Sequence, residues 1–97
     1  MKNDTTLSVK IHDLLESQGF QTHTKGYKYV KLAIEMCFND RKYLSSWTKS
    51  LYPDIAKIYD DTASRVERAL RYSIEVAGLN TTISKFISKM VYKLEVM

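Results

Sequence analysis

The chain has 97 residues, of which 44% are apolar and 27% are charged, and this balance excludes an intrinsically disordered or collagen-like chain. One globular domain over residues 1–97 is the expectation for this length. Three glycines and one proline leave few breaks, which favours an all-α bundle of about five to six short helices over a sheet with many turns. The net charge of +4 permits a polyanionic partner without requiring one.

The first part of the chain predicts two amphipathic helices. Apolar residues recur at helical spacing from Leu7 to Leu15, and this helix is expected to end near Gly19. The polar stretch after Gly19 has no period and is expected to be a connection. A second helix is expected over residues 26–38, with a buried stripe formed by Tyr27, Val30, Ile34, Cys37 and Phe38.

Two short helices are expected on either side of Pro53. The first, over residues 43–51, is closed by the proline, because a residue before proline (here Tyr52) is biased away from helical geometry. Pro53 then suits the first position of the second, over residues 53–59. The side chains available for burial in these two helices are Tyr43, Leu44, Trp47 and Leu51, then Ile55, Ala56 and Ile58.

The last two predicted helices span residues 63–77 and 82–94. Asp61 or Thr62 can cap the first of them, and Gly78 suits its end. Its inward face is expected to consist of Val66, Ala69, Leu70, Ser73 or Ile74, and Ala77. The final helix carries a strong apolar stripe of Ile83, Phe86, Ile87, Met90, Val91 and Leu94.

The helices predicted at 53–59 and 63–77 have the layout of a helix-turn-helix, in which the second helix enters the major groove of DNA. The small Ala56 allows the two helices to approach closely. Asp60 stands where the turn requires an unusual backbone conformation, which Asp tolerates better than most residues.

Three of the four arginines fall in one seven-residue stretch, 65–71, of the second of these helices. Arginine donates two hydrogen bonds to guanine, and a carboxylate accepts one from cytosine. We therefore expect base contacts from Arg65, Glu67 and Arg68, and contacts to the DNA backbone from Ser64, Arg71 and Tyr72. A solvated helix face carrying an ordinary Glu67–Arg71 pair explains the same pattern, so both interpretations stay open on pattern alone.

A row of lysines, Lys25, Lys28 and Lys31, lies along the second predicted helix. These lysines are candidates for tracking DNA phosphates beside the arginine-rich helix. A solubilising face opposite the buried stripe explains them equally well. The aromatic residues Tyr27, Tyr43, Trp47 and Tyr59 are expected to build the core rather than stack on bases.

The stretches KGYKYVKLAIEM and SSWTKSLYPDIAKIYDDTASRVERALRYSIEVA closely resemble the C-terminal effector domain of stage 0 sporulation protein A, the sporulation response regulator. The resemblance covers roughly residues 11–77 and is densest over 51–77. It implies DNA reading in the major groove at a TGTCGAA-like box. It implies contacts to bases from Arg65, Glu67 and Arg68, and contacts to the DNA backbone from Ser64 and Arg71. Lys25, in the KGY motif, also matches the family pattern.

The chain departs from that family in three places. The family has a phosphoacceptor receiver domain before this module, so its absence here predicts no control by phosphorylation within the chain. After Ala77 the family has a longer segment with a helix associated with RNA polymerase contact, where this chain has only GLNTT. Tyr72 replaces the usual His of the family, which leaves its backbone contact in question.

Other chemistries find little support in the sequence. His12 and His23 are not placed near a Cys or acidic cluster with ligand spacing, so no metal site and no cofactor are expected. Cys37 is expected to be a core thiol, and Asp60 and Asp61 to form a turn and a cap rather than a catalytic pair. We therefore expect no enzyme. No membrane span or signal peptide is predicted, which favours a cytoplasmic protein.

Two functional hypotheses follow. In the first, the chain is a DNA-binding transcriptional regulator that binds double-stranded DNA as a head-to-tail homodimer on tandem boxes and competes with a full-length homologous regulator. In the second, it is a protein-interaction module that uses its last helix, or the apolar surface left by the missing helix, to bind such a regulator or a subunit of RNA polymerase.

Overall fold

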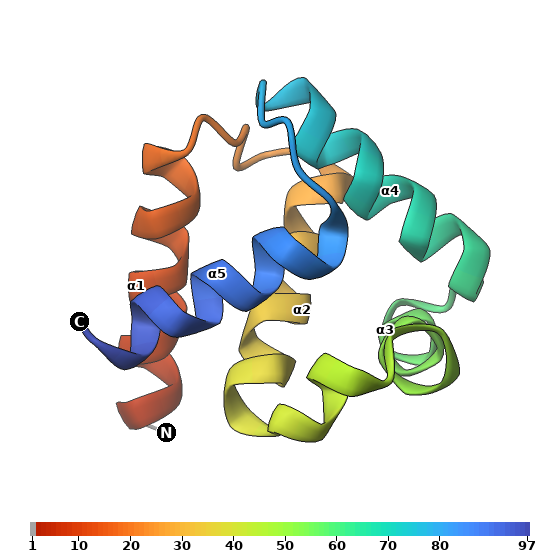
Figure 1. Cartoon of the computed structure of the whole chain (residues 1–97), viewed down its shortest axis with the longest axis horizontal. Coiled ribbons are helices and arrows are strands. Elements are labelled where there is room, and N and C mark those ends of the chain that lie inside the picture. Colours follow the sequence, from red (N-terminus) through yellow and green to blue (C-terminus); the bar gives the residue numbers. More distant parts are fainter. Residues whose placement is uncertain (1) are drawn as a thin grey trace.

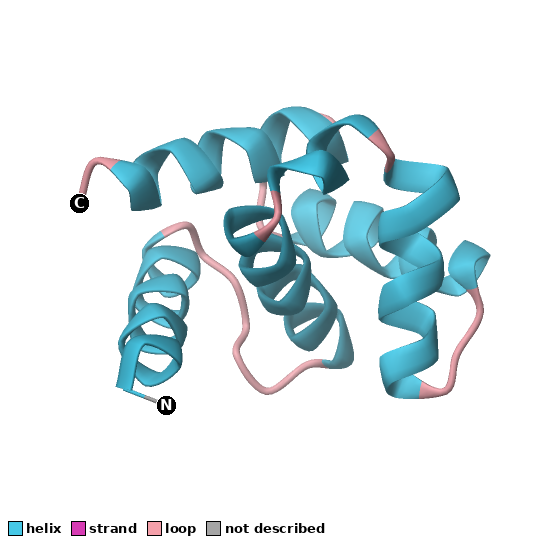
Figure 2. Ribbon diagram, turned by 90° about the horizontal axis from the view of Figure 1, so that it is seen from below, coloured by secondary structure: helices cyan, strands magenta, loops and turns pink. Residues whose placement is uncertain are grey.

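The computed structural model describes the backbone of residues 2–97 and the side chains of residues 6–97 (Figure 1). Over these residues the fold is all-α, as predicted, with no strand (Figure 2). It contains five α-helices, α1 (Lys2–Ser17), α2 (Lys25–Asn39), α3 (Tyr52–Tyr59), α4 (Ala63–Val76) and α5 (Ile83–Glu95), together with a 3-10 helix, η1 (Arg41–Ser45), and a π-helical turn, η2 (Trp47–Leu51). None of the described helices is both long and apolar enough to cross a bilayer.

Helix α2 is the centre of the fold and contacts α1, α3, α4 and α5 (Figure 1). Its predicted stripe is buried except for Phe38, which is half-buried. Tyr29 and Ala33 are buried as well, although the sequence did not predict them. A stripe analysis assumes that a helix is covered on one side, whereas α2 is covered on several.

The two ends of the described chain lie on the same side of the molecule, beside α1 and the end of α5, in both views (Figures 1 and 2). The apolar repeat located α1 from residue 7 onward, but the helical backbone begins at Lys2. The repeat marks only the part of α1 that packs, where Ile11 and Leu15 are fully buried. Helix α5 buries all but one residue of its predicted stripe, Ile83 being half-buried.

The prediction for residues 43–51 is wrong in one respect. Instead of one helix that stops before Pro53, η1 and η2 follow one another and η2 runs directly into α3. Tyr52 is helical, with φ −63° and ψ −44°. The bias against helical geometry before proline is only a preference, and burial of Leu51 and Tyr52 in the core outweighs it. Pro53 remains in the first turn of α3, where its missing N–H costs nothing.

Helix α3 is covered on one side only, through Tyr52, Ile55 and Ala56. Ile58, which we expected to be buried, is therefore 59% exposed. The opening of α3 is joined to η1 by a hydrogen bond of 2.5 Å that the Tyr43 hydroxyl donates to Asp54 Oδ2.

Helix α2 approaches α4 closely at Gly26. A Cβ atom at this position would lie 1.9 Å from Ser73 Oγ and 3.3 Å from Ser73 Cβ. Because a real Cβ atom does not tolerate the first of these distances, glycine at this position permits the close contact between α2 and α4.

Gly26→Ala is expected to destabilise the fold by about 1–3 kcal/mol, the usual cost of overpacking a tight contact. Urea unfolding measures the change. Adding Ser73→Ala removes the oxygen at 1.9 Å and should restore part of the loss. A double variant no more stable than Gly26→Ala alone would contradict this explanation.

Candidate nucleic-acid interface

The turn between α3 and α4 is built on one left-handed residue. Asp60 has φ 53° and ψ 54° and is the only non-glycine residue with positive φ in the part of the chain that the structure describes. Its backbone N–H and that of Asp61 both reach the Ala56 carbonyl, so the carbonyl at the end of α3 is satisfied. The predicted role of Asp60 at the turn is confirmed.

Helix α4 begins with a well-formed cap. Thr62 Oγ1 accepts a hydrogen bond of 3.2 Å from the backbone N–H of Arg65, as expected for an N-cap threonine. Asp61 Oδ1 in turn accepts one of 2.8 Å from the N–H of Thr62. Of the two predicted candidates, Thr62 is therefore the cap of α4, and Asp61 binds the backbone N–H of that capping residue.

The inward side of α4 is formed by Val66, Leu70 and Ile74, which are buried. The opposite side carries most of the predicted DNA contacts as exposed residues, namely Ser64, Arg65, Arg68, Arg71 and Tyr72. Arg65 and Arg68 lie in the first half of the helix, the part that reaches base edges in a helix-turn-helix. Among the described side chains, none forms an ion pair with Arg68.

Glu67 lies at the edge of this face rather than at its centre. Its carboxylate pairs with the guanidinium of Arg71, one turn along the helix, and its side chain is 35% exposed. Both residues line an open groove of about 830 Å³ between η2, α4 and the start of α5, beside Trp47, Tyr52 and Ile83. The Glu67–Arg71 pair that the alternative interpretation predicted is therefore present.

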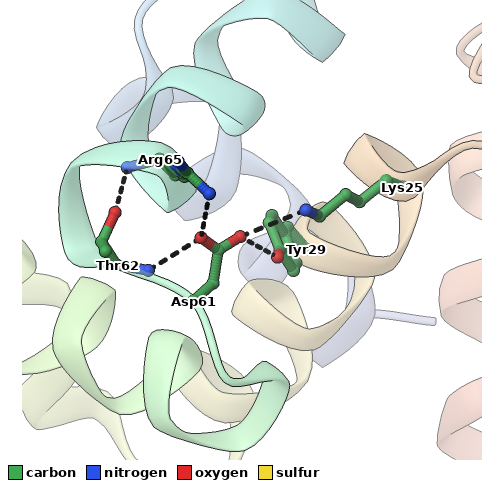
Figure 3. Close-up of polar contacts among 5 residues, drawn as sticks. All are labelled: Lys25, Tyr29, Asp61, Thr62 and Arg65. Atoms are coloured by element: carbon green, nitrogen blue, oxygen red, sulfur yellow. Dashed lines mark hydrogen bonds and ion pairs between the residues drawn. The ribbon is translucent and has the colours of Figure 1, made fainter.

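Asp61 connects α2 to α4 (Figure 3). Its Oδ2 accepts a hydrogen bond of 2.5 Å from the Tyr29 hydroxyl and lies 3.3 Å from Lys25 Nζ. Its Oδ1 lies 3.9 Å from Arg65 Nη1. The Asp61 side chain is only 5% exposed, whereas those of Lys25 and Arg65 are 66% and 73% exposed.

These contacts keep Asp61 ionised. The hydrogen bonds from Tyr29 and from the Thr62 backbone, together with Lys25, lower the pKa of Asp61 to about 2. Burial and the same hydrogen bond raise the pKa of Tyr29 to about 12. Across the physiological range the site therefore holds a carboxylate and a neutral phenol.

A lowered pKa makes Asp61 stabilise the fold more when it is ionised. This contribution is complete above the unfolded-state pKa of about 3.9 and is lost as the pH falls toward the folded-state pKa of about 2. We expect the free energy of unfolding, measured with urea at several pH values in this window, to fall more steeply for the wild type than for Asp61→Asn. Parallel curves would show that Asp61 does not titrate as described.

Lys28 lies beside the same turn. Its Nζ is 5.2 Å from the centre of the Tyr59 ring, and the Tyr59 and Tyr29 rings are 5.2 Å apart. Tyr59 was expected in the core but is 37% exposed, because it stands at the end of α3. Lys25 and Lys28 thus flank the helix-turn-helix as exposed cations, whereas Lys31 is half-buried.

Sequence reasoning missed Tyr29 and treated Asp61 only as a cap. The signal for Tyr29 was its position one turn after Lys25, which places both side chains on one side of α2. Its partner Asp61 is 32 residues away along the chain, and no local pattern links the two.

A second correction concerns His12. Asp13 and Glu16 bring their oxygens within 4.8 Å of a His12 nitrogen and of each other, so the expectation that His12 lies far from an acidic cluster with ligand spacing is wrong. His12 Nδ1 is also 2.6 Å from the Tyr27 hydroxyl. Both carboxylates are exposed on the surface of α1, and exposed acidic groups commonly lie close together without holding a metal ion.

The comparison with protein families agrees with this geometry. The family model described as "Sporulation initiation factor Spo0A C terminal" matches residues 11–96. The match includes the helix-turn-helix, the central helix and all of α5. This is a family of transcription-factor domains and not of enzymes. With 86 of its 97 residues inside the match, the chain belongs to the Spo0A C-terminal family of DNA-binding effector domains.

Proposed function

We propose that the chain is a sequence-specific transcriptional regulator of the sporulation-initiation type, whose α4 region (62–77) reads a short G/C-containing box in the major groove. The observation that carries this proposal is the position of Arg65 and Arg68, which are exposed on the first half of α4 just beyond the turn at Asp60. Guanidinium groups in this position suit the paired acceptors of guanine.

The remaining predicted contacts have supporting roles in this proposal. The side chains around Arg65 and Arg68 that are exposed and contact the DNA backbone are those of Lys25, Lys28, Ser64 and Tyr72. Arg71 exchanges its partner Glu67 for a phosphate, and the freed carboxylate accepts a hydrogen bond from a cytosine amine.

The test is a binding titration by fluorescence anisotropy at about 0.15 M salt, close to physiological ionic strength. One duplex carries a TGTCGAA-like box and the other the same bases scrambled. Tighter binding to the box supports the proposal. Equal affinity for both duplexes removes sequence reading, because phosphate contacts alone do not distinguish them.

We further propose that two copies bind head to tail on tandem boxes and compete there with a full-length homologous regulator. Titration of duplexes with one and with two boxes should then give complexes of one and two protein chains. A one-chain complex on both duplexes would contradict the pairing.

The alternative, a module that binds a regulator or RNA polymerase through the last helix, has less support. Phe86, Ile87, Met90, Val91 and Leu94 are buried in the core of this chain. The apolar stripe of α5 is therefore already covered, and a partner would have to bind its polar side.

A further inference from the structure

We infer that Asp61 determines specificity by positioning Arg65 and Lys25, so that Arg65 is presented to a base and Lys25 to one backbone phosphate, and neither cation binds phosphates indiscriminately. This inference rests on the proposed function and names a residue that acts through others. Asp61 does not itself meet the DNA, because its side chain is 5% exposed.

The geometry supports action through the two cations. Lys25 lies at the start of α2 and Arg65 in the first turn of α4, and their charged ends reach different oxygens of the same carboxylate (Figure 3). Asp61 contacts each cation with a different oxygen, at 3.3 Å for Lys25 and 3.9 Å for Arg65. Both side chains remain largely exposed beyond that contact, so they are restrained and still accessible.

The carboxylate is itself fixed in place. The Tyr29 hydroxyl holds one oxygen and the Thr62 N–H holds the other. Tyr29 is 1% exposed in the central helix, and Thr62 is the cap of α4. The Asp61 carboxylate is therefore held in one position, and the side chains of Lys25 and Arg65 adjust to it.

Removing this charge has opposite effects on the two kinds of binding. Without Asp61, Arg65 becomes available to phosphates, Lys25 is no longer held at one backbone position, and a negative charge disappears from beside the DNA, so affinity for any duplex rises. Arg65 meanwhile loses the partner that directs it, so the preference for the box falls. A rise in general affinity together with a fall in discrimination is not expected from a residue that only stabilises the fold.

Asp61→Asn tests the inference, because asparagine removes the charge while its single oxygen still accepts a hydrogen bond from the Thr62 N–H and its NH2 group can donate one to the Tyr29 hydroxyl oxygen. We expect tighter binding to scrambled DNA. The discrimination ratio, which is the affinity for the box divided by the affinity for scrambled DNA, should fall by about fivefold or more, within the range that one arginine–guanine contact contributes. The slope of log affinity against log salt should steepen by up to about 0.9, the value for one additional neutralised phosphate.

Asp54→Asn is the matched control. Asp54 also accepts a hydrogen bond of 2.5 Å from a tyrosine hydroxyl, but among the described side chains it forms no ion pair with Lys or Arg. It should leave the discrimination ratio and the salt slope unchanged. An equal loss of discrimination in both Asn variants would overturn the inference.

A double-mutant cycle with Arg65→Ala completes the test. If Asp61 acts through Arg65, Asp61→Asn should lower discrimination in the wild type but not in the Arg65→Ala background. Losses that add fully, or an Asp61→Asn variant that discriminates as well as the wild type, would overturn the inference. Asp61→Ser, which also lacks the charge, provides the same readings if the Asn variant does not fold.

Failure of the two proposals is distinguishable. A wild type that binds box and scrambled DNA equally overturns the proposed function, and this inference falls with it. A wild type that discriminates, together with an unchanged Asp61→Asn variant, overturns the inference alone.

Discussion

Arg68→Ala is expected to weaken binding to the box by about 1–3 kcal/mol, or about 5- to 150-fold, while binding to scrambled DNA changes far less. Arg68 is exposed in the first half of α4, and among the described side chains it has no ion-pair partner to leave before it meets guanine. Anisotropy titrations on duplexes with substitutions at each box position should show relaxed preference at one or two positions.

Lys28→Ala is the matched control for Arg68→Ala. Lys28 is an exposed cation beside the same turn, but it is proposed to contact phosphate. It should weaken binding to all duplexes alike and reduce the salt slope by about 1. If Arg68→Ala also weakens all duplexes equally, Arg68 is a backbone contact and the assignment of base reading to it is wrong.

Leu70→Ala is expected to destabilise the fold by about 2–5 kcal/mol. Leu70 has no exposed surface and lies on the inward side of α4, which packs against α2 and α3. Truncation leaves a cavity between these three helices, and the cost is a large fraction of the stability of a domain this small. Thermal unfolding followed by circular dichroism should show a Tm lower by about 10 °C or more.

Tyr72→Ala provides the comparison on the same helix. Tyr72 is 65% exposed, so its removal should change stability by no more than about 0.5 kcal/mol. Similar Tm losses for the two variants would contradict the assignment of the inward and outward sides of α4.

The helix-turn-helix was the most predictable part of the fold because its signals are local. A left-handed Asp60, a Thr62 cap and the spacing of Val66 and Leu70 are each set by residues within a few positions of one another. Their agreement located the turn and the start of α4, and the structure confirms both.

The segment before α3 could not be predicted in the same way. The proline rule is a local preference, and it was overridden by burial of Leu51 and Tyr52, which depends on how distant helices surround them. Ile58 shows the converse, since an apolar residue at a suitable spacing stays exposed where no neighbouring helix covers it.

In the candidate site, too, the features set by local sequence were predictable and those set by the packing of distant helices were not. The exposed arginines follow from the helical period and the resemblance, whereas the Asp61 contacts with Tyr29 and Lys25 require α2 and α4 to be packed together. Gly26 contributes to that packing through its close approach to Ser73, which is visible only in three dimensions.

The two sides of α4 share almost no residues, and this has a consequence for how such a protein diversifies. Exchanges at Ser64, Arg65 or Arg68 alter what the helix reads without touching the buried side chains or the Thr62 cap. New target preferences are therefore open to selection at little risk to folding. Asp61 is the exception, because it contacts both the backbone of the Thr62 cap and the side chain of Arg65. We therefore expect it to change together with Arg65 in chains that acquire a different target.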